Sequence, residues 1–148
     1  MNSDIAPSLP SGYGRFTAQE QELLELTGKL LQSIHEGDLV TYTQLSMEDL
    51  SCYETDVAPY RVDGLDFHLE LISAMQRIGT YNNLIRFDML NPGVQIYGDC
   101  AIVTYTRLMT YAYDTGPAWS AFNETRVFVQ KNESWKMAHF HRSSCATA

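Results

Sequence analysis

Cysteines and long apolar runs are scarce in this sequence, and their scarcity argues against several classes of protein. There are three cysteines in 148 residues, at positions 52, 100 and 145, and no pair has CxxC spacing. An odd number without that spacing argues against a disulfide framework and a zinc ribbon, and it suits a reducing compartment. No apolar run approaches 18 residues, and residues 1–11 lack the apolar region of a signal peptide. We therefore expect a cytoplasmic protein with no membrane partner.

Positive charge is also in short supply. The chain has 10 Lys and Arg against 18 Asp and Glu, a formal net charge of −8, so it would repel a nucleic acid. It has no glycine-rich phosphate loop and no GxSxG nucleophile elbow. We expect no nucleic-acid partner, no cofactor and no nucleotide chemistry. With 45% hydrophobic residues, the length fits one domain with its own core.

The C-terminal third, residues 99–144, is predicted to form three long antiparallel strands, each with one arginine in an apolar row. Burying a guanidinium without a partner costs several kcal/mol, so three in one sheet imply carboxylates or a wet cavity that holds them. The sheet is therefore predicted to enclose a basic pocket. The side-chain period of two groups the inward rows as Val103, Tyr105, Arg107, Met109 and Tyr111; Phe122, Glu124, Arg126 and Phe128; and Ala138, Phe140 and Arg142.

Three helices are predicted ahead of these strands. Thr17 and Glu20 match a capping box that begins the first helix, and Gly37 ends it. Asp38 caps a short second helix, and apolar residues at helical spacing predict a third over residues 65–78.

The remaining segments are predicted to be strands and tails. Residues 50–59 are predicted to form one brief strand with Glu54 near its end, and Arg61 and Val62 another. Residues 81–97 are predicted to form a long strand that bends at an Asn-Pro-Gly sequence. The predicted fold is α+β, with three helices packed on one face of a curved antiparallel sheet. The domain is expected over residues 17–144, between a flexible or docking tail at 1–16 and a short tail at 145–148.

Histidines are candidates for a functional role. His68 shares one helix face with Leu71, Ile72 and Met75, so it is predicted to point inward. A lone inward histidine is usually a satisfied core residue, but three arginines facing the same cavity make it a candidate pocket residue. His139 and His141 alternate onto the opposite face of the sheet. Without a third ligand they suit packing or an interface better than zinc, so no metal is expected.

Five segments of the sequence resemble one known family: IHEGDLVTYTQL, VDGLDFH, LNPGVQIYGDCAIVTYTRLMTY, NETRVF and WKMAHFHRS. They look like the association, or hub, domain of calcium/calmodulin-dependent protein kinase II, in the same order and over about residues 17–144. That family belongs to the nuclear transport factor 2-like, or SnoaL-like, superfamily of cone-shaped α+β folds. The resemblance implies a homo-oligomer of two stacked rings that holds kinase domains at its periphery, with kinase hub subunits as further partners.

The resemblance also implies a deep pocket for a small carboxylate or a peptide. Glu54 matches an acidic residue in the family's short second strand. The sequence departs from the family at Gln76, where a Trp is common, and at Gly93, where a His is common. The pocket positions of the family, which periodicity also selects, are His68, Arg107, Arg126 and Arg142.

Two functions from different classes fit these observations. One is a cavity enzyme of the isomerase, dehydratase or cyclase type, with His68 and Glu54 as acid and base, and a ligand-binding module is a further alternative to it. Three arginines favour carboxylate binding over such a base, because they lower the pKa of His68. With 16 residues ahead of the hub-like region, we expect a free-standing hub or a fragment of a kinase, and no enzyme activity. The other function is a self-assembling scaffold, and we favour it. Its outward contact residues are expected to include Phe87, Met89, Tyr97, Tyr113 and Trp119.

Overall fold

The computed structural model describes residues 15–145, which form three helices and six strands. Apart from residues 15, 16 and 145, the expected tails at 1–16 and 145–148 lie outside this range. No helix within it is both long and apolar enough to span a bilayer. The elements in chain order are α1 (Ala18–Glu36), α2 (Leu39–Gln44), β1 (Ser46–Glu54), β2 (Val62–Asp63), α3 (Leu65–Ile78), β3 (Leu84–Tyr97), β4 (Cys100–Tyr113), β5 (Gly116–Lys131) and β6 (Ser134–Ser144).

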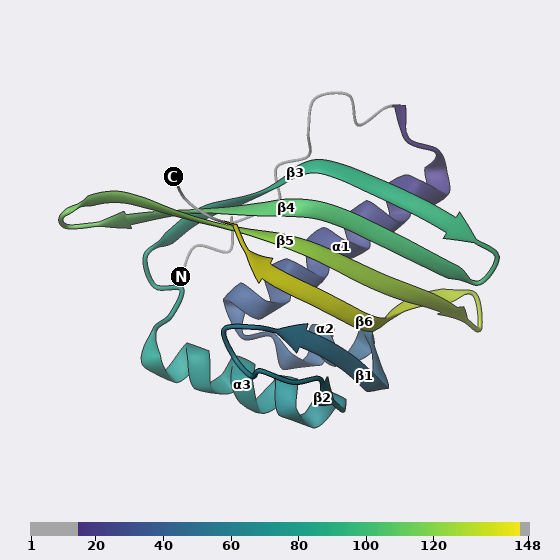
Figure 1. Ribbon diagram of the computed structural model, residues 1–148, viewed down its shortest axis with the longest axis horizontal. Helices are drawn as coiled ribbons and strands as arrows, with labels where there is room; N and C mark the ends of the chain where they lie inside the picture. Colours follow the sequence, from purple (N-terminus) through teal and green to yellow (C-terminus); the bar gives the residue numbers. More distant parts are fainter. Residues whose placement is uncertain (1–14, 146–148) are drawn as a thin grey trace.

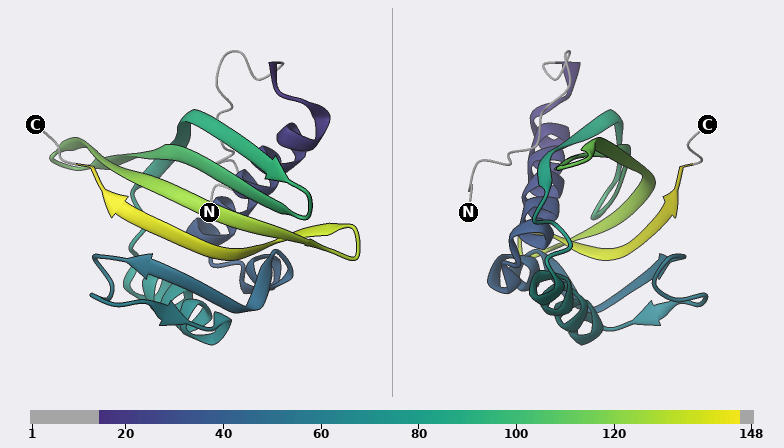
Figure 2. Two further views of the ribbon diagram at one scale, coloured as in Figure 1. Left: turned by 45° about the vertical axis from the view of Figure 1, so that its right-hand side comes forward. Right: turned by 90° about the vertical axis from the view of Figure 1, so that its left-hand side faces the viewer.

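The six strands form a single curved sheet in the order β2-β1-β6-β5-β4-β3 (Figures 1 and 2). Strands β3 to β6 are the predicted antiparallel meander, and the three helices cover its concave face, so the predicted α+β class is confirmed. The sheet is larger than that meander, because β1 joins β6 in parallel. This pairing sets Glu54 opposite Arg142. Local patterns did not reveal it, since the two strands are about 90 residues apart in sequence.

Capping and one close contact fix the helices that face the sheet. The predicted capping box is present, with the Thr17 hydroxyl accepting from the amide of Glu20 and the Glu20 carboxylate accepting from the amide of Thr17. Gly37 ends α1 with a φ of 70°, and a Cβ there would collide with the side chain of Gln76. The Gln76 side-chain amide donates to the carbonyl of His35 at 2.8 Å, which ties α3 to the end of α1.

Two predictions about the strands are wrong in detail. The first strand was expected over residues 50–59, but β1 ends at Glu54, whose carbonyl accepts from the amides of Val57 and Ala58 in a tight turn. In β6 a register shift opposite the Val127/Phe128 pair makes Ala138 an extra residue. Met137 is therefore buried in the inward position that alternation had given to Ala138. The bend in β3 is confirmed by a register shift between residues 90 and 93.

The core fills the space between the helices and the sheet. Phe87 and Met89 were expected on an outward contact surface, but both are fully buried there, because β3 turns them toward α1. Tyr97, Tyr113 and Trp119 are exposed, as expected. Core residues from α1, β1, β3 and β5 include Leu23, Leu24, Leu30, Leu31, Leu50, Phe87 and Phe128.

Candidate functional site

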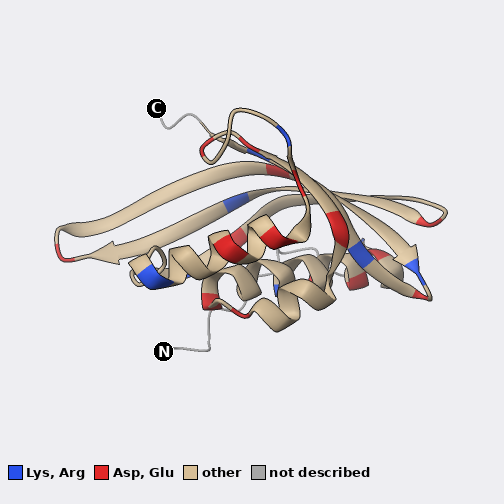
Figure 3. Ribbon diagram, turned by 90° about the horizontal axis from the view of Figure 1, so that it is seen from below, with Lys and Arg blue, Asp and Glu red and all other residues tan. Residues whose placement is uncertain are grey.

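A cavity of about 50 Å³ lies between the concave face of the sheet and the helices. Acidic residues recur on the helices and hairpin ends of this molecule, so an arginine-lined cavity contrasts with the surface around it (Figure 3). The strands β4, β5 and β6 each contribute one arginine, β1 contributes a glutamate and α3 a histidine. The structure thus brings all five sequence-predicted site residues around one cavity: Glu54, His68, Arg107, Arg126 and Arg142.

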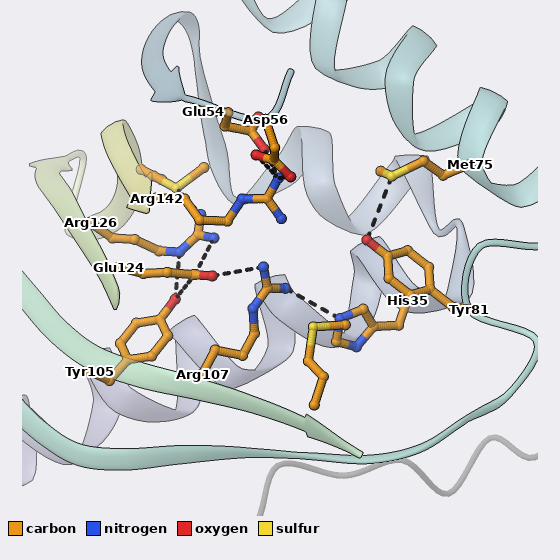
Figure 4. A network of polar contacts seen from close by, with 12 residues as sticks. His35, Glu54, Asp56, Met75, Tyr81, Tyr105, Arg107, Glu124, Arg126 and Arg142 are labelled. Carbon is orange, nitrogen blue, oxygen red and sulfur yellow. Dashed lines mark hydrogen bonds and ion pairs between the residues drawn. The ribbon is translucent and has the colours of Figure 1, made fainter. Parts of the chain in front are cut away.

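Four residues, Tyr105, Arg107, Glu124 and Arg126, form what we call the inner arginine centre (Figure 4). The Glu124 carboxylate is completely buried and pairs with Nη2 of Arg107 at 2.7 Å and Nη2 of Arg126 at 3.0 Å. Arg126 Nε donates to the hydroxyl of Tyr105 at 2.7 Å, and that hydroxyl donates to Glu124 at 2.6 Å. One buried carboxylate therefore holds two guanidiniums.

The electrostatics of the inner arginine centre keep Glu124 ionised. Burial alone would raise its pKa, but the charges of Arg107 and Arg126, together with the hydrogen bond from Tyr105, lower the pKa to about 2. Removing one partner of a buried ion pair leaves an uncompensated charge, which is strongly destabilising. This centre is thus a structural element of the cavity wall.

His35, at the end of α1, extends the inner arginine centre and was missed by the sequence analysis. Its Nε2 lies 3.3 Å from Nη1 of Arg107, and its ring packs against Tyr81 and Phe87 with centroids 4.8 Å away in each case. Burial, and then the charge of Arg107, lowers the pKa of His35 to about 3. The imidazole is therefore neutral at pH 7, and Nε2 accepts a hydrogen bond from Arg107.

Arg142, Glu54 and Asp56 form the outer arginine centre, closer to solvent (Figure 4). Nη2 of Arg142 lies 3.0 Å from Glu54 Oε2 and 2.8 Å from both carboxylate oxygens of Asp56. The Glu54 side chain is 10% exposed, whereas that of Asp56 is 48% exposed. Burial raises the pKa of Glu54, and the Arg142 charge opposes that shift. One guanidinium here faces two carboxylates, the reverse of the inner arginine centre.

His68 lies beside the outer arginine centre. Its Nδ1 is 3.9 Å from Glu54, and burial, followed by the charge of Arg126, lowers its pKa to about 4. The imidazole is therefore neutral at pH 7, so its contact with Glu54 is not an ion pair. Its Nε2 has no hydrogen-bond partner among residues 15–145, which leaves one ring nitrogen free to meet a ligand.

Cys52, Glu54 and His68 bring three potential metal-ligand atoms within 4.8 Å of one another. The neighbouring charges oppose a cation, because Arg142 already pairs with Glu54. Burial, and then the nearby Glu54, raises the pKa of the Cys52 thiol to about 12, so no thiolate is available at neutral pH.

On the outer face of the sheet, His139 shares a hydrogen bond of 2.7 Å with the Ser51 hydroxyl, and its ring packs on Tyr53.

Sequence signals existed for two of the residues that the analysis left out of the site. Glu124 lies two residues before Arg126, so the strand period puts both on one face. His35 follows Leu24 and Leu31 at spacings of 11 and 4, on the buried stripe of α1. Asp56 gave no signal, because its place beside Arg142 depends on the parallel pairing of β1 with β6.

Comparison with known proteins identifies one family along almost the whole chain. The family model described as calcium/calmodulin dependent protein kinase II association domain matches residues 19–146. The delta subunit of calcium/calmodulin-dependent protein kinase type II from Oryctolagus cuniculus is 33% identical over 132 residues, which are 88% of this chain and 24% of that protein. The Caenorhabditis elegans kinase is 30% identical over 97% of this chain and 19% of its own length. The chain thus spans about a quarter or less of the curated relatives it matches.

Solved structures give the same result and place the fold. The CaMKII hub of S. rosetta has a TM-score of 0.70 and 29% identity, covering 94% of this chain and 99% of that one. The association domain of C. elegans CaMKII has a TM-score of 0.73 and 30% identity, covering 85% and 95%. An NTF2-like protein from Rhodospirillum rubrum shows the fold alone. It has a TM-score of 0.64 and 21% identity, and the match covers 84% of this chain and 98% of that one. A candidate ketosteroid isomerase from Shewanella frigidimarina also shows the fold alone. Its TM-score is 0.66 and its identity 20%, and the match covers 80% of this chain and 91% of that one.

Proposed function

Because the chain belongs to the calcium/calmodulin-dependent protein kinase II association domain family, we propose that it is a self-assembling hub whose copies close into a multimer of stacked rings. Its partners in this proposal are further copies of itself and kinase hub subunits. Hub structures that match nearly the whole chain support it. The proposal places the protein in the cytoplasm, since all three of its cysteines are free thiols, as in a reducing compartment.

The observation that carries the assembly proposal is a set of exposed aromatic side chains on the sheet. Trp119 is 59% exposed, Tyr97 64% and Tyr113 45%. Tyr113 lies at the tip of the β4–β5 hairpin, seen at the left of Figure 1, and Trp119 lies on the stretch of β5 that, among the described residues, pairs with β4 but not with β6. The register of β4 with β5 puts Trp119 and Tyr113 on opposite faces of this hairpin, and Tyr97 lies at the other end of β4, beside the β3–β4 turn. Exposed large apolar groups mark surfaces that bind another protein. Contacts between copies would bury them.

Sedimentation velocity on matched variants tests the assembly. Trp119→Glu puts a charge in the proposed contact, so the particle should dissociate to smaller species at micromolar concentration. Tyr60→Glu makes a similar change at a residue that is 66% exposed on the β1–β2 loop, away from the hairpin. This control should sediment as the unmodified protein does. If Trp119→Glu also sediments as the unmodified protein does, the hairpin takes no part in the contact between copies.

We further propose that the cavity binds a small carboxylate. Its volume of about 50 Å³ supports a carboxylate of acetate size over a peptide. Nε of Arg107, Nε of Arg142 and Nε2 of His68 are buried without partners among the described residues, so the cavity offers donors to an incoming anion. Acetate, compared with chloride at equal ionic strength, should raise the melting temperature by binding the folded state. An unchanged melting temperature would contradict this part of the proposal.

A cavity enzyme is the second candidate. It is favoured by Glu54 and His68, which lie 3.9 Å apart in the cavity as an acid and base pair would. Isomerase-type chemistry begins by removing a proton next to a carbonyl. In D2O the protein should then exchange such protons of a small keto acid, and Glu54→Gln should stop the exchange. Exchange at the buffer rate would exclude this candidate.

A further inference from the structure

We propose that Asp56 is a built-in competitor for the outer arginine centre. Its carboxylate occupies the edge of Arg142 that a ligand carboxylate would take, so that binding exchanges one carboxylate for another. This inference rests on the carboxylate pocket proposed above. It adds the residue that sets the affinity of the pocket and its preference for anions.

The Nη2 side of the Arg142 guanidinium is already occupied, while its Nε has no partner among residues 15–145. Both oxygens of Asp56 lie 2.8 Å from its Nη2, and Glu54 lies 3.0 Å from the same nitrogen (Figure 4). Its planar face lies over the Phe122 ring, with Cζ 4.7 Å from the centroid. An anion that approaches this arginine from solvent therefore meets the carboxylate of Asp56 first.

Arg142 is the arginine at which an exchange can occur. Arg107 and Arg126 share Glu124, which water does not reach. Displacing Glu124 would leave a buried charge without compensation, which costs far more than an exposed exchange. The ion pairs of the inner arginine centre must therefore stay intact while a ligand binds.

Asp56 is the carboxylate that can leave. Its side chain is about half exposed and lies in the turn after β1. The backbone of that turn is closed by the amides of Val57 and Ala58 on the carbonyl of Glu54, so rotation of the Asp56 side chain returns it to water without opening the chain. Glu54 lies within β1 and is nearly buried, so it stays in place.

Charge balance makes exchange more favourable than addition. The outer arginine centre has one cation and two carboxylates, and a ligand carboxylate bound beside both would put three anions around one guanidinium. If the ligand replaces Asp56, the charge count is unchanged. A neutral amide of the same size cannot replace the ion pair, so the site should prefer acetate to acetamide.

The test compares acetate binding to the whole chain and to Asp56→Asn, by calorimetric titration at fixed ionic strength. Removing an exposed competing charge should tighten acetate binding about 1.5- to 5-fold, the range of exposed ion pairs. Asp63→Asn is the matched control, because Asp63 is similarly exposed and pairs at 2.8 Å with Arg61, which, unlike Arg142, does not line the cavity. Its acetate affinity should equal that of the unmodified chain, and acetamide should bind none of the three proteins.

The outcomes separate the inference from the pocket beneath it. If acetate binds the unmodified chain and Asp56→Asn equally well, Asp56 does not compete and the inference fails while the pocket stands. Equal tightening in Asp63→Asn would also overturn it, because the effect would then follow net charge. If acetate binds none of the variants, the pocket and the inference fail together, whatever the mass of the particle.

Discussion

The arginines of the inner and outer arginine centres line the same cavity and pair with carboxylates, but those carboxylates have different surroundings. In the inner centre, buried Glu124 meets two guanidiniums and a tyrosine hydroxyl. In the outer centre, Arg142 meets two carboxylates, one of which, Asp56, is half exposed. The number of donors per carboxylate and the access of water therefore distinguish a contact that holds the fold from one that can exchange.

The largest expected effect concerns the stability of the inner arginine centre. Glu124→Gln leaves the buried Arg107 and Arg126 without their shared carboxylate, so the free energy of unfolding should fall by about 3–5 kcal/mol. Glu54→Gln should lose less, because burial already raises the pKa of Glu54 and the amide resembles its neutral form. Urea unfolding at one fixed protein concentration measures both. Equal losses would erase the distinction between the two centres.

An intermediate effect concerns acid. The folded-state pKa is about 3 for His35 and about 4 for His68, both below the value of about 6.5 in an unfolded chain. Below pH 6.5 the unfolded state binds protons that the folded state does not, so stability falls as the pH falls toward these values. At pH 5 each histidine should cost about 2 kcal/mol relative to pH 7.

Melting curves between pH 7 and pH 5 check the contribution of His35. His35→Gln should be less sensitive to pH than the unmodified chain over that interval, because one of the two buried histidines no longer titrates in the unfolded state. His141→Gln is a suitable control, since His141 is exposed on the opposite side of the sheet. An acid response that is the same in all three proteins would contradict the burial of His35.

The smallest expected effect is on the stability of the outer arginine centre. Asp56→Asn should change the free energy of unfolding by less than about 1 kcal/mol, since exposed ion pairs contribute little. Asp63→Asn should behave alike. Urea unfolding of the two variants provides the measurement, and a loss near that of Glu124→Gln would show that Asp56 holds the fold rather than an exchangeable contact.

The sequence predicted the architecture because its signals are local. Helix caps at Thr17 and Gly37 and the period of two around Arg107 and Arg126 depend only on neighbouring residues, and the structure has the helices and inward rows that they indicate. The resemblance to a hub domain agreed with the same fold, and the family match confirms it.

The rest depended on contacts that no local pattern contains. The parallel pairing of β1 with β6 brings Asp56 to Arg142 across 86 residues of sequence. The bulge at Ala138 puts Met137 in the inward position that the period of two assigns to Ala138, and a strict period of two does not predict an extra residue in a strand. Phe87 and Met89 were expected outside because a monomer of this size was not expected to bury all of its large apolar side chains, but the structure buries both against α1.

Native mass spectrometry of the unmodified chain at micromolar concentration tests the proposed hub most directly. We expect one dominant closed species whose mass is a many-fold multiple of the 16.8 kDa subunit. A stable monomer of 16.8 kDa, or a plain dimer, would contradict it.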